Sequence, residues 1–411
     1  MALPCNEYIP VNFVDRDDDF LKLTNLTASL PLPTRSQRIV LLVGNSNIGK
    51  TSLLCKFFNH LVDLGIFWPV FISLKDFKDY SGNRFAIEIL SKLYHSISIA
   101  YGLPQDQTLD ANTPADFNLK VVDELLSKTP GDQPVILLFD EVSMLSTAQL
   151  KLFEDYFLKT CINLPKVLVV LAGRYQVTTW KNFDLRPRQS LINNDDSTVR
   201  ELKGFEPNNS EKQISSLEEK AIVFTSKIHS VSGGSPGYNR RIVEQLIRNN
   251  FQFDELAALQ ACNEELYAAV QAAGNDLPPE QARELLPALE ALCVLLDFDK
   301  DYEAPLLLAA HEGLQGEWTA KRSSELLQNL SRIHVGAGKL VDWNGQDAYV
   351  VEEEARRTFE MELKLRNRAL WTKLHTTAKE MYDEWVRKFP PGEVFVGKSN
   401  YHSGRLSEKD Q

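Results

Sequence analysis

A glycine-rich stretch near the start of the chain reads Gly44-Asn45-Ser46-Asn47-Ile48-Gly49-Lys50-Thr51 and fits the pattern G-x-x-x-x-G-K-[ST]. The apolar run Ile39 to Val43 precedes it, and a helical pattern opens at Thr51. A strand, a glycine loop and a helix N-terminus in this order aim several backbone N–H groups and the positive end of a helix dipole at one point. The stretch therefore predicts a phosphate-binding P-loop.

The chemistry of this loop assigns roles to its last residues. Lys50 is expected to reach the β- and γ-phosphates, and the Thr51 hydroxyl is expected to be a ligand for Mg²⁺. Gly44 and Gly49 allow backbone angles and close approaches that a Cβ would forbid. The residues expected to bind the nucleotide here are Gly44, Asn45, Ser46, Asn47, Ile48, Gly49, Lys50, Thr51 and Ser52.

A second motif follows further along, where an apolar run from Val135 to Phe139 ends in Asp140 and Glu141. A central parallel strand has this composition when its carboxyl end opens on a ligand. Asp140 is expected to hold Mg²⁺ through water. Glu141 is then expected to orient or deprotonate the attacking water, which makes it the candidate catalytic base.

A third buried run, Lys166 to Gly173, carries an arginine just past its end, Arg174. An arginine at the carboxyl edge of a parallel sheet is where a sensor of the γ-phosphate would lie. An exposed loop arginine fits the same spacing equally well. We therefore keep Arg174 as a candidate catalytic residue with both interpretations open.

Strands and helices alternate up to about Phe205, which predicts an α/β fold in which a P-loop NTPase parallel sheet has helices on both faces. Helices alone follow, and then a winged-helix pattern with a turn signal at Asn344-Gly345. The predicted organisation is a leader (1–37), a nucleotide-binding domain (38–205), a helical domain (206–284), a winged-helix domain (285–351), and a C-terminal helix with a polar tail (352–411). The tail from Gly392 onward is expected to be disordered.

Composition narrows the class of protein. The chain has 411 residues, 43% hydrophobic and 25% charged, and no apolar run approaches the roughly 18 residues needed to cross a bilayer. The N-terminus is acidic where a secretory signal is basic, so the cytoplasm is the expected location. Five scattered cysteines without C-x-x-C spacing are expected to be reduced. A net charge of −11 argues against non-specific attraction to nucleic acid.

Two further sites are ambiguous from the residues alone. The segment Ser232 to Arg241 contains Gly233, Gly234 and Gly237, and it forms either an elbow that points Pro236 or Arg240 at the nucleotide or a plain turn between helices. Arg16, in the leader, is either a surface charge or a residue beside the nucleotide base.

Taken together, the motifs resemble those of bacterial signal-transduction ATPases of the STAND class, near the NACHT and NB-ARC branches of the wider AAA+ group. The matching residues, in chain order, are Phe13-Val14-Asp15-Arg16, Gly44 to Thr51, Val135 to Glu141, Leu171-Ala172-Gly173-Arg174 and Gly234-Ser235-Pro236. The resemblance implies that Val14 and Arg16 pack on adenine and that Pro236 belongs to a G-x-P motif at the nucleotide.

The function that the resemblance implies is an ATP/ADP-gated switch with slow Mg²⁺-dependent hydrolysis, coupled to domain opening or to homo-oligomer assembly with an effector or signal partner. Two departures matter. The NB-ARC branch has a histidine in its winged helix that touches the nucleotide, whereas Val351-Glu352-Glu353 contains none. Such proteins also usually have a repeat sensor after the winged helix, so either the chain is a fragment or it lacks a sensor.

Two other functions compete with the switch. A DNA-handling AAA+ ATPase of the replication-initiator or transposition kind would use the winged helix in the major groove. Arg322, Arg332, His334 and Lys339 favour that function, while the net charge and Glu352-Glu353-Glu354 oppose it. A small-molecule or polynucleotide kinase is the third, and beyond the phosphate loop the sequence gives it no second substrate pocket.

Overall fold

The computed structural model describes residues 14, 16–30, 38–101, 133–161, 163–174, 199–336, 338–343, 348–389 and 393–408. The chain divides into two compact units. One comprises Met1–Ser216 together with Ser235–Gly237, and the other comprises Leu217–Gly234 and Tyr238–Gln411. We describe each unit by itself.

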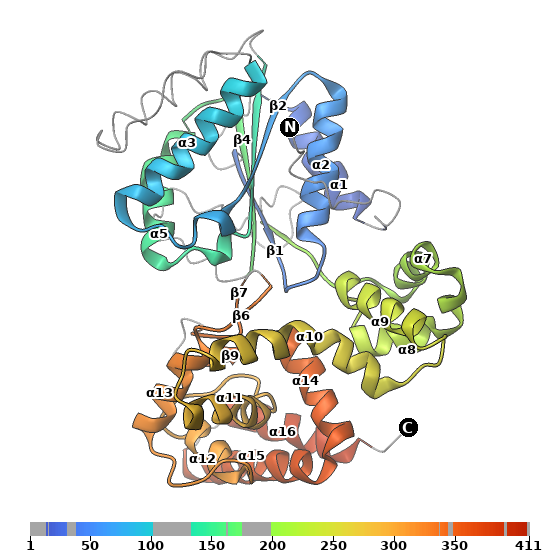
Figure 1. Cartoon of the computed structure of the whole chain (residues 1–411), viewed down its shortest axis with the longest axis vertical. Helices are drawn as coiled ribbons and strands as arrows, with labels where there is room; N and C mark the ends of the chain where they lie inside the picture. Colours follow the sequence, from blue (N-terminus) through green and yellow to red (C-terminus); the bar gives the residue numbers. More distant parts are fainter. Residues whose placement is uncertain are drawn as a thin grey trace. The chain divides into compact units, whose positions relative to one another are not determined.

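A five-stranded sheet forms the centre of the first unit (Figure 1). Its strands are β1 (Ile39–Val43), β2 (Trp68–Ser73), β3 (Val135–Asp140), β4 (Val167–Gly173) and β5 (Val199–Glu201). The order is β2-β3-β4-β1-β5, and every pairing is parallel. Because β4 separates β1 from β3, the P-loop and the acids after β3 come from strands that are not direct neighbours.

Helices cover both faces of this sheet, as the sequence predicts (Figure 1). Successive side chains of a strand point to opposite faces, and the side chains of β1, β3 and β4 are all buried. One face packs against α1 (Asp17–Ala28) and α2 (Lys50–Leu64). The other packs against α3 (Gly82–Tyr101) and the helical run that starts with α5 (Thr147–Leu152) and continues through Phe153–Leu158 and Lys159–Cys161.

Local sequence sets the ends of these helices. α2 begins within the P-loop, at Lys50, and ends before Gly65, whose φ of 65° gives the left-handed C-cap that glycine adopts without a Cβ clash. α5 begins with a capping box, in which Ser146 and Gln149 satisfy each other's backbone N–H groups. Gln149 also donates to three backbone carbonyls of residues 77–80, which fixes the segment after β2.

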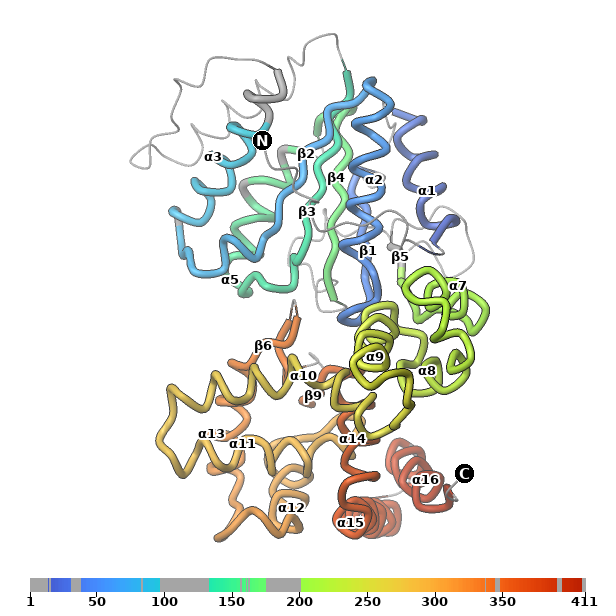
Figure 2. The backbone as a smooth tube through the Cα atoms, turned by 45° about the vertical axis from the view of Figure 1, so that its right-hand side comes forward, coloured from blue at the N-terminus to red at the C-terminus, as the bar shows by residue number. Residues whose placement is uncertain are grey.

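The second unit is mainly helical (Figure 2). After α7 (Pro207–Leu217), which lies at the end of the first unit, its helices are α8 (Thr225–Ser232), α9 (Pro236–Arg248), α10 (Glu255–Gly274), α11 (Pro279–Leu292), α12 (Glu303–Ala310), α13 (Ala320–Leu330), α14 (Glu353–Arg366), α15 (Arg368–Lys388) and α16 (Glu393–Ser407). α10 packs on α11 and α14, and α15 packs along α16.

Short antiparallel strands follow α13. They are β6 (His334–Val335) with β7 (Gly338–Lys339), and β8 (Val341–Trp343) with β9 (Tyr349–Val351). Phe298, between α11 and α12, forms an isolated antiparallel bridge with Tyr349 of β9. The predicted boundary between residues 284 and 285 lies within α11. The turn signal Asn344-Gly345 lies outside the described residues, and the winged-helix assignment stays a prediction.

Two expectations are wrong. The tail from Gly392 was expected to be disordered, yet residues 393–407 form α16. Its Phe395 and Leu406 pack on the apolar core, and its His402 is buried against His375 of α15, so the polar composition conceals an inward face. Cys55 is disulfide-bonded, although Cys161, Cys262 and Cys293 are free and buried as expected.

In the part of the chain that the structure describes, no helix is both long and apolar enough to cross a membrane.

Candidate nucleotide-binding site

The P-loop follows β1 with the backbone geometry that a phosphate cradle requires. A Cβ at Gly44 would meet the backbone oxygen of Leu202 at 2.7 Å, so the loop passes too close to the end of β5 for any side chain. Gly49 has φ 93°, which favours glycine, and Asn47 has φ 61° in the left-handed region. Loop and helix thereby bring their N–H groups toward a common point at the start of α2.

Lys50 is folded over the loop that precedes it. Its Nζ donates to the carbonyl oxygens of Gly44, at 2.8 Å, and Asn45, at 2.6 Å. A lysine ammonium has three donors and a flexible stem, so it can exchange such contacts for phosphate oxygens without moving the backbone. This placement agrees with the role predicted for Lys50, and the role itself stays a prediction.

Thr51 and Asp140 meet at the predicted metal position. The Thr51 Oγ1 donates to Oδ2 of Asp140 at 2.6 Å, although the two residues lie on α2 and β3. Asp140 is only 4% exposed, and burial raises the pKa of its carboxyl above 3.8. The hydrogen bond from Thr51 opposes that shift, while the neighbouring charge of Glu141 adds to it.

A hydroxyl beside a carboxylate fits Mg²⁺, which prefers oxygen ligands, keeps several waters and commonly takes only one or two protein carboxylates beside phosphate oxygens. Within the described ranges no group of three or more His, Cys, Asp or Glu side chains is placed to hold a metal ion. The donor set at Thr51 and Asp140 therefore suits a metal that arrives with a nucleotide, and suits a self-contained protein cage poorly.

Glu141 stands directly after β3 in a constrained conformation. Its φ of 59° is unusual for a residue with a side chain, and such outliers gather at functional sites. Its Oε2 accepts a hydrogen bond of 2.7 Å from the hydroxyl of Ser73, the last residue of β2. The neighbouring strand thus holds the candidate base by a single contact.

Arg174 is buried beside the P-loop. Only 5% of it is exposed, which excludes the alternative of an exposed loop arginine. Its guanidinium donates to the hydroxyl of Ser46 in the P-loop, and its backbone N–H donates to Oγ of Ser143 at 3.3 Å. The side chain is therefore joined to the loop that would hold the phosphates, and the sensing of a γ-phosphate remains a prediction.

Arg16 connects the segment before α1 to the same loop. Its guanidinium donates to the backbone oxygens of Ile48, at 3.1 Å, and Lys203, at 2.5 Å, and it lies over the ring of Phe205 at 5.1 Å. These contacts exclude a plain surface charge. Val14 is half-buried nearby in the sequence, and the contact of either residue with adenine stays a prediction.

The tripeptide Ser235–Gly237 also lies on the P-loop. Although its neighbours in sequence belong to the second unit, these three residues group with the first. Pro236 comes within van der Waals reach of the position that a Cβ on Gly49 would occupy, at 3.9 Å. Arg240, the other residue considered for this role, instead pairs with Glu244 on its own helix. The interpretation as a plain turn between helices does not account for these contacts.

Two serines of this site were not foreseen: Ser73 as the partner of Glu141, and Ser143 as an acceptor for the backbone of residue 174. Ser46 was expected to bind the nucleotide, but its contact with Arg174 was not. The only sequence signal for Ser73 is that it is the polar residue ending a buried strand. That signal gains meaning once β2 is known to lie beside β3.

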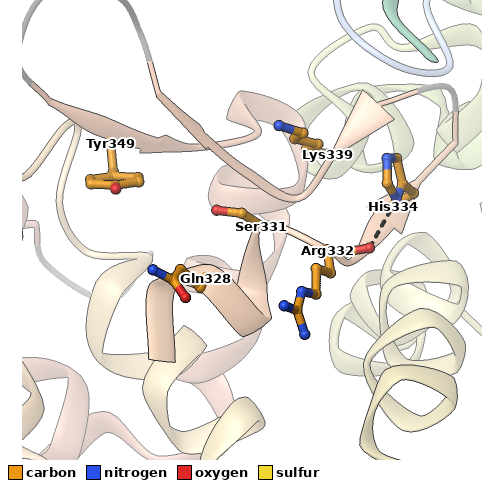
Figure 3. A pocket seen from close by; sticks show the side chains of 6 residues that line it. All are labelled: Gln328, Ser331, Arg332, His334, Lys339 and Tyr349. Carbon is orange, nitrogen blue, oxygen red and sulfur yellow. Dashed lines mark hydrogen bonds between the residues drawn. The ribbon is translucent and has the colours of Figure 1, made fainter. Parts of the chain in front are cut away.

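A pocket also lies in the helical unit. The pocket, of about 480 Å³, is lined by Gln328, Ser331, Arg332, His334, Lys339 and Tyr349, as Figure 3 shows. It therefore contains three of the four basic residues that the sequence suggested for nucleic acid. The fourth, Arg322, stacks on Trp318 and pairs with Glu284.

The comparisons with known proteins concern the fold. No protein-family model matches the sequence, and no curated protein matches it. Among solved structures, the chain is similar to a Walker-type ATPase of Pyrococcus abyssi, with a TM-score of 0.50 and 16% identity over 84% of this chain and 95% of that one.

Two weaker similarities are to the Orc1 protein of Aeropyrum pernix in complex with DNA and to a STAND protein with a tetratricopeptide repeat sensor from Pyrococcus horikoshii. Their TM-scores are 0.47 and 0.36, each at 16% identity. The alignments cover 88% and 98% of this chain, and 95% and 49% of those chains. With the Walker-type ATPase of Pyrococcus abyssi, the chain shares a P-loop α/β fold followed by a helical region.

Proposed function

We propose that this protein is a regulatory ATPase that binds ATP or ADP with Mg²⁺ at the P-loop and hydrolyses ATP slowly. The observation that carries the proposal is that Asp140, at the end of β3, and Arg174, just past the end of β4, both contact the segment after β1, at Thr51 and Ser46. Ligands of open α/β sheets bind at this edge, outside the carboxyl ends of the strands.

Each of these residues has a separate part in the proposed chemistry. Lys50 and the P-loop N–H groups bind phosphate oxygens, while Thr51 and Asp140 hold the metal, which neutralises charge on those oxygens. Glu141 orients the attacking water and takes its proton. Ser73 holds Glu141 by one hydrogen bond of 2.7 Å, so the base is restrained until that bond breaks. A restrained base is consistent with slow turnover.

The switch, as opposed to simple hydrolysis, is supported by the tripeptide Ser235–Gly237. It lies on the P-loop, yet the chain on either side belongs to the helical unit. A ligand that changes the P-loop therefore acts on a segment that leads directly into α8 and α9. A ligand can shift an equilibrium between two conformations only by its differential affinity for them. We therefore expect ATP to act together with an effector. The proposed result is domain opening or assembly of a homo-oligomer.

The test uses the purified full chain with ADP and with a non-hydrolysable ATP analogue. We expect ADP to co-purify, and the two nucleotides to give different protease cleavage within residues 205–285. The Lys50→Ala variant, which loses the phosphate contact, should give one cleavage pattern with either nucleotide. Identical patterns for the unaltered chain would contradict the switch.

A DNA-handling ATPase is the second candidate, and the pocket in Figure 3 favours it. Arg332, His334 and Lys339 there could take up backbone phosphates, although the net charge of −11 opposes binding. Duplex DNA binding that weakens with salt, and weakens further in Lys339→Ala, would favour this candidate. Binding that ignores that substitution would count against it.

A further inference from the structure

The segment Ser235–Gly237 forms hydrogen bonds with the P-loop at Asn47. The backbone N–H of Gly237 donates to the Asn47 carbonyl oxygen at 3.0 Å, and the Ser235 hydroxyl donates to the same oxygen at 3.2 Å. Asn47 occupies a variable position of the P-loop motif, so the motif itself gives no reason for this arrangement.

One of these hydrogen bonds satisfies an N–H group in the first turn of a helix. α9 begins at Pro236, and the N–H groups of its first turn have no acceptor within the helix. A serine just before a helix normally accepts from that turn through its own hydroxyl. Here the Ser235 hydroxyl donates to the carbonyl oxygen of Asn47, and the same oxygen accepts from Gly237 in the first turn. The start of α9 is thus satisfied partly by the P-loop.

The fit between the two segments is close. A Cβ on Gly237 would lie 2.6 Å from Cβ of Asn47, a distance that real Cβ atoms do not tolerate. Gly237 is in a helix and is absent from the residues with positive φ. The backbone there would accept alanine readily, so close approach to Asn47 is the reason for glycine at this position.

The residues on either side of this segment form hydrogen bonds within the helical unit. The Ser232 hydroxyl donates to Oδ1 of Asn239 at 2.6 Å and accepts from the N–H of Gly234 at 3.1 Å, and Ser232 and Asn239 are fully buried. Arg357 of α14 donates to the Val231 carbonyl at 2.9 Å. The turn before residues 235–237 is therefore joined by hydrogen bonds to α8, α9 and α14.

We propose that Asn47 is a positioning residue, through which Ser235–Gly237 fixes the conformation of the P-loop and so sets its affinity for nucleotide. The left-handed φ of 61° at Asn47 is maintained by the two hydrogen bonds to its carbonyl. Linkage requires the reverse effect as well, so a nucleotide that tightens the P-loop tightens the start of α9. This inference rests on the proposed binding of nucleotide at the P-loop.

A double-mutant cycle tests the inference with ADP and calorimetry on the full chain. Gly237→Ala should lower ADP affinity at least tenfold, because the added Cβ pushes Asn47 out of position. Asn47→Gly keeps the carbonyl, accepts the left-handed backbone and removes the Cβ, so its own ADP affinity is the reference for the double variant. The double variant should recover to within threefold of Asn47→Gly, because the atoms that clash are gone.

Gly397→Ala is the matched control. It makes the same substitution inside α16, where an added Cβ has no neighbour within 4 Å, and it should leave ADP affinity unchanged. An unchanged affinity in Gly237→Ala, or an equal loss with and without Asn47→Gly, would overturn the proposal.

Amide hydrogen exchange without nucleotide provides a second readout, which remains informative even if the chain binds no ADP. Gly237→Ala should speed exchange in residues 44–51 and leave α14 to α16 unchanged, and Asn47→Gly should suppress that increase. Faster exchange throughout the chain would indicate a merely structural defect and contradict the proposal. Absence of ADP binding in the unaltered protein would instead contradict the proposed function.

Discussion

Two buried carboxylates, Asp140 in the P-loop unit and Glu360 in the helical unit, have opposite environments. Glu360 is 2% exposed and accepts hydrogen bonds from Arg356, His375, Tyr401 and Arg405. Burial alone would raise its pKa, but the hydrogen bond from His375 and the charge of Arg405 hold the pKa at about 2. Burial raises the pKa of Asp140 despite its hydrogen bond from Thr51.

The contrast separates structure from function. A buried carboxylate surrounded by donors on α14, α15 and α16 joins three helices, and its charge is fully compensated. Asp140 is a buried carboxylate whose ionised form is destabilised, and this is the environment expected of a group that binds a cation with the nucleotide. The predictions below test this distinction, and the variants are taken in order of decreasing expected effect.

The largest effect is expected for the candidate catalytic base, Glu141, and it concerns the rate of ATP hydrolysis. Glu141→Gln should lower the rate of ATP hydrolysis by roughly 10²–10⁴-fold, the usual contribution of a general base, and keep nucleotide affinity within a few-fold. The reason is that Glu141 acts on water in the transition state, while Lys50 and the P-loop bind the ground state. Phosphate release and fluorescent-nucleotide binding measure the two quantities. Hydrolysis at the unaltered rate would remove Glu141 from the mechanism.

The second prediction concerns Glu360, the buried carboxylate whose charge is compensated, and the stability of the folded chain. Glu360→Gln should destabilise the folded chain by about 3–5 kcal/mol, because Arg356 and Arg405 lose their buried counter-charge. Urea denaturation followed by tryptophan fluorescence measures this, with the exposed Glu384→Gln on α15 as a control that should change nothing. Affinity for ADP should be unchanged under native conditions. A stability equal to that of the unaltered chain would contradict the structural role.

The pH dependence of this carboxylate has a definite sign. Because the folded pKa of Glu360, about 2, lies below the ordinary 4.5, its contribution to stability is complete above pH 4.5 and is lost as the pH falls toward 2. His402 acts in the same direction, since burial and the charge of His375 lower its pKa to about 3, and the native state then resists protonation below pH 6.5. Denaturation of Glu360→Gln should show a weaker loss in acid than the unaltered chain.

A smaller effect is expected at Arg174. Arg174→Ala should bind ADP within about threefold of the unaltered chain but lose about tenfold in preference for ATP, as one charge-assisted hydrogen bond to the γ-phosphate would provide. Competition binding with ADP and a non-hydrolysable ATP analogue measures the ratio. Equal losses for both nucleotides would mark Arg174 as a support for Ser46 and the P-loop.

The smallest effect has the opposite sign from Glu360. Asp140→Asn should stabilise the nucleotide-free chain by about 1 kcal/mol near neutral pH, as substitutions that relieve a functional site often do. Since burial raises the pKa of Asp140, its ionised form costs stability as the pH rises above 3.8, and asparagine removes that cost. The same variant should lose Mg²⁺-dependent hydrolysis. Destabilisation at neutral pH would show that Asp140 is compensated after all.

The predictable part of this site is the part that short stretches of chain encode. Gly44 to Thr51 and Asp140-Glu141 each follow an apolar strand, and both the residues and their place at the carboxyl edge of the sheet could be derived from that. Arg174 was correctly placed at the end of β4, but sequence left its burial open, because one residue past a strand can face inward or outward.

The rest depended on which segments become neighbours. Ser73 meets Glu141 only because β2 pairs with β3, and the sequence predicts a parallel sheet without its strand order. α16 was missed because Ser399 and His402 on its inward face are polar and hydrogen-bond to Asp383 and His375 on α15. Hydrophobic periodicity does not detect such a face.

The contact between Asn47 and Ser235 has a consequence for synthesis of the chain. The two residues are 188 positions apart, so at 5–20 residues per second the ribosome adds Ser235 roughly 10–40 s after Asn47. β1 pairs with β4 and β5, so the sheet around the P-loop can be complete once Glu201 has been added, before the segment that supports the Asn47 carbonyl is synthesised. We therefore expect the nascent protein to complete its phosphate loop in two steps, first with the sheet and then with the start of α9.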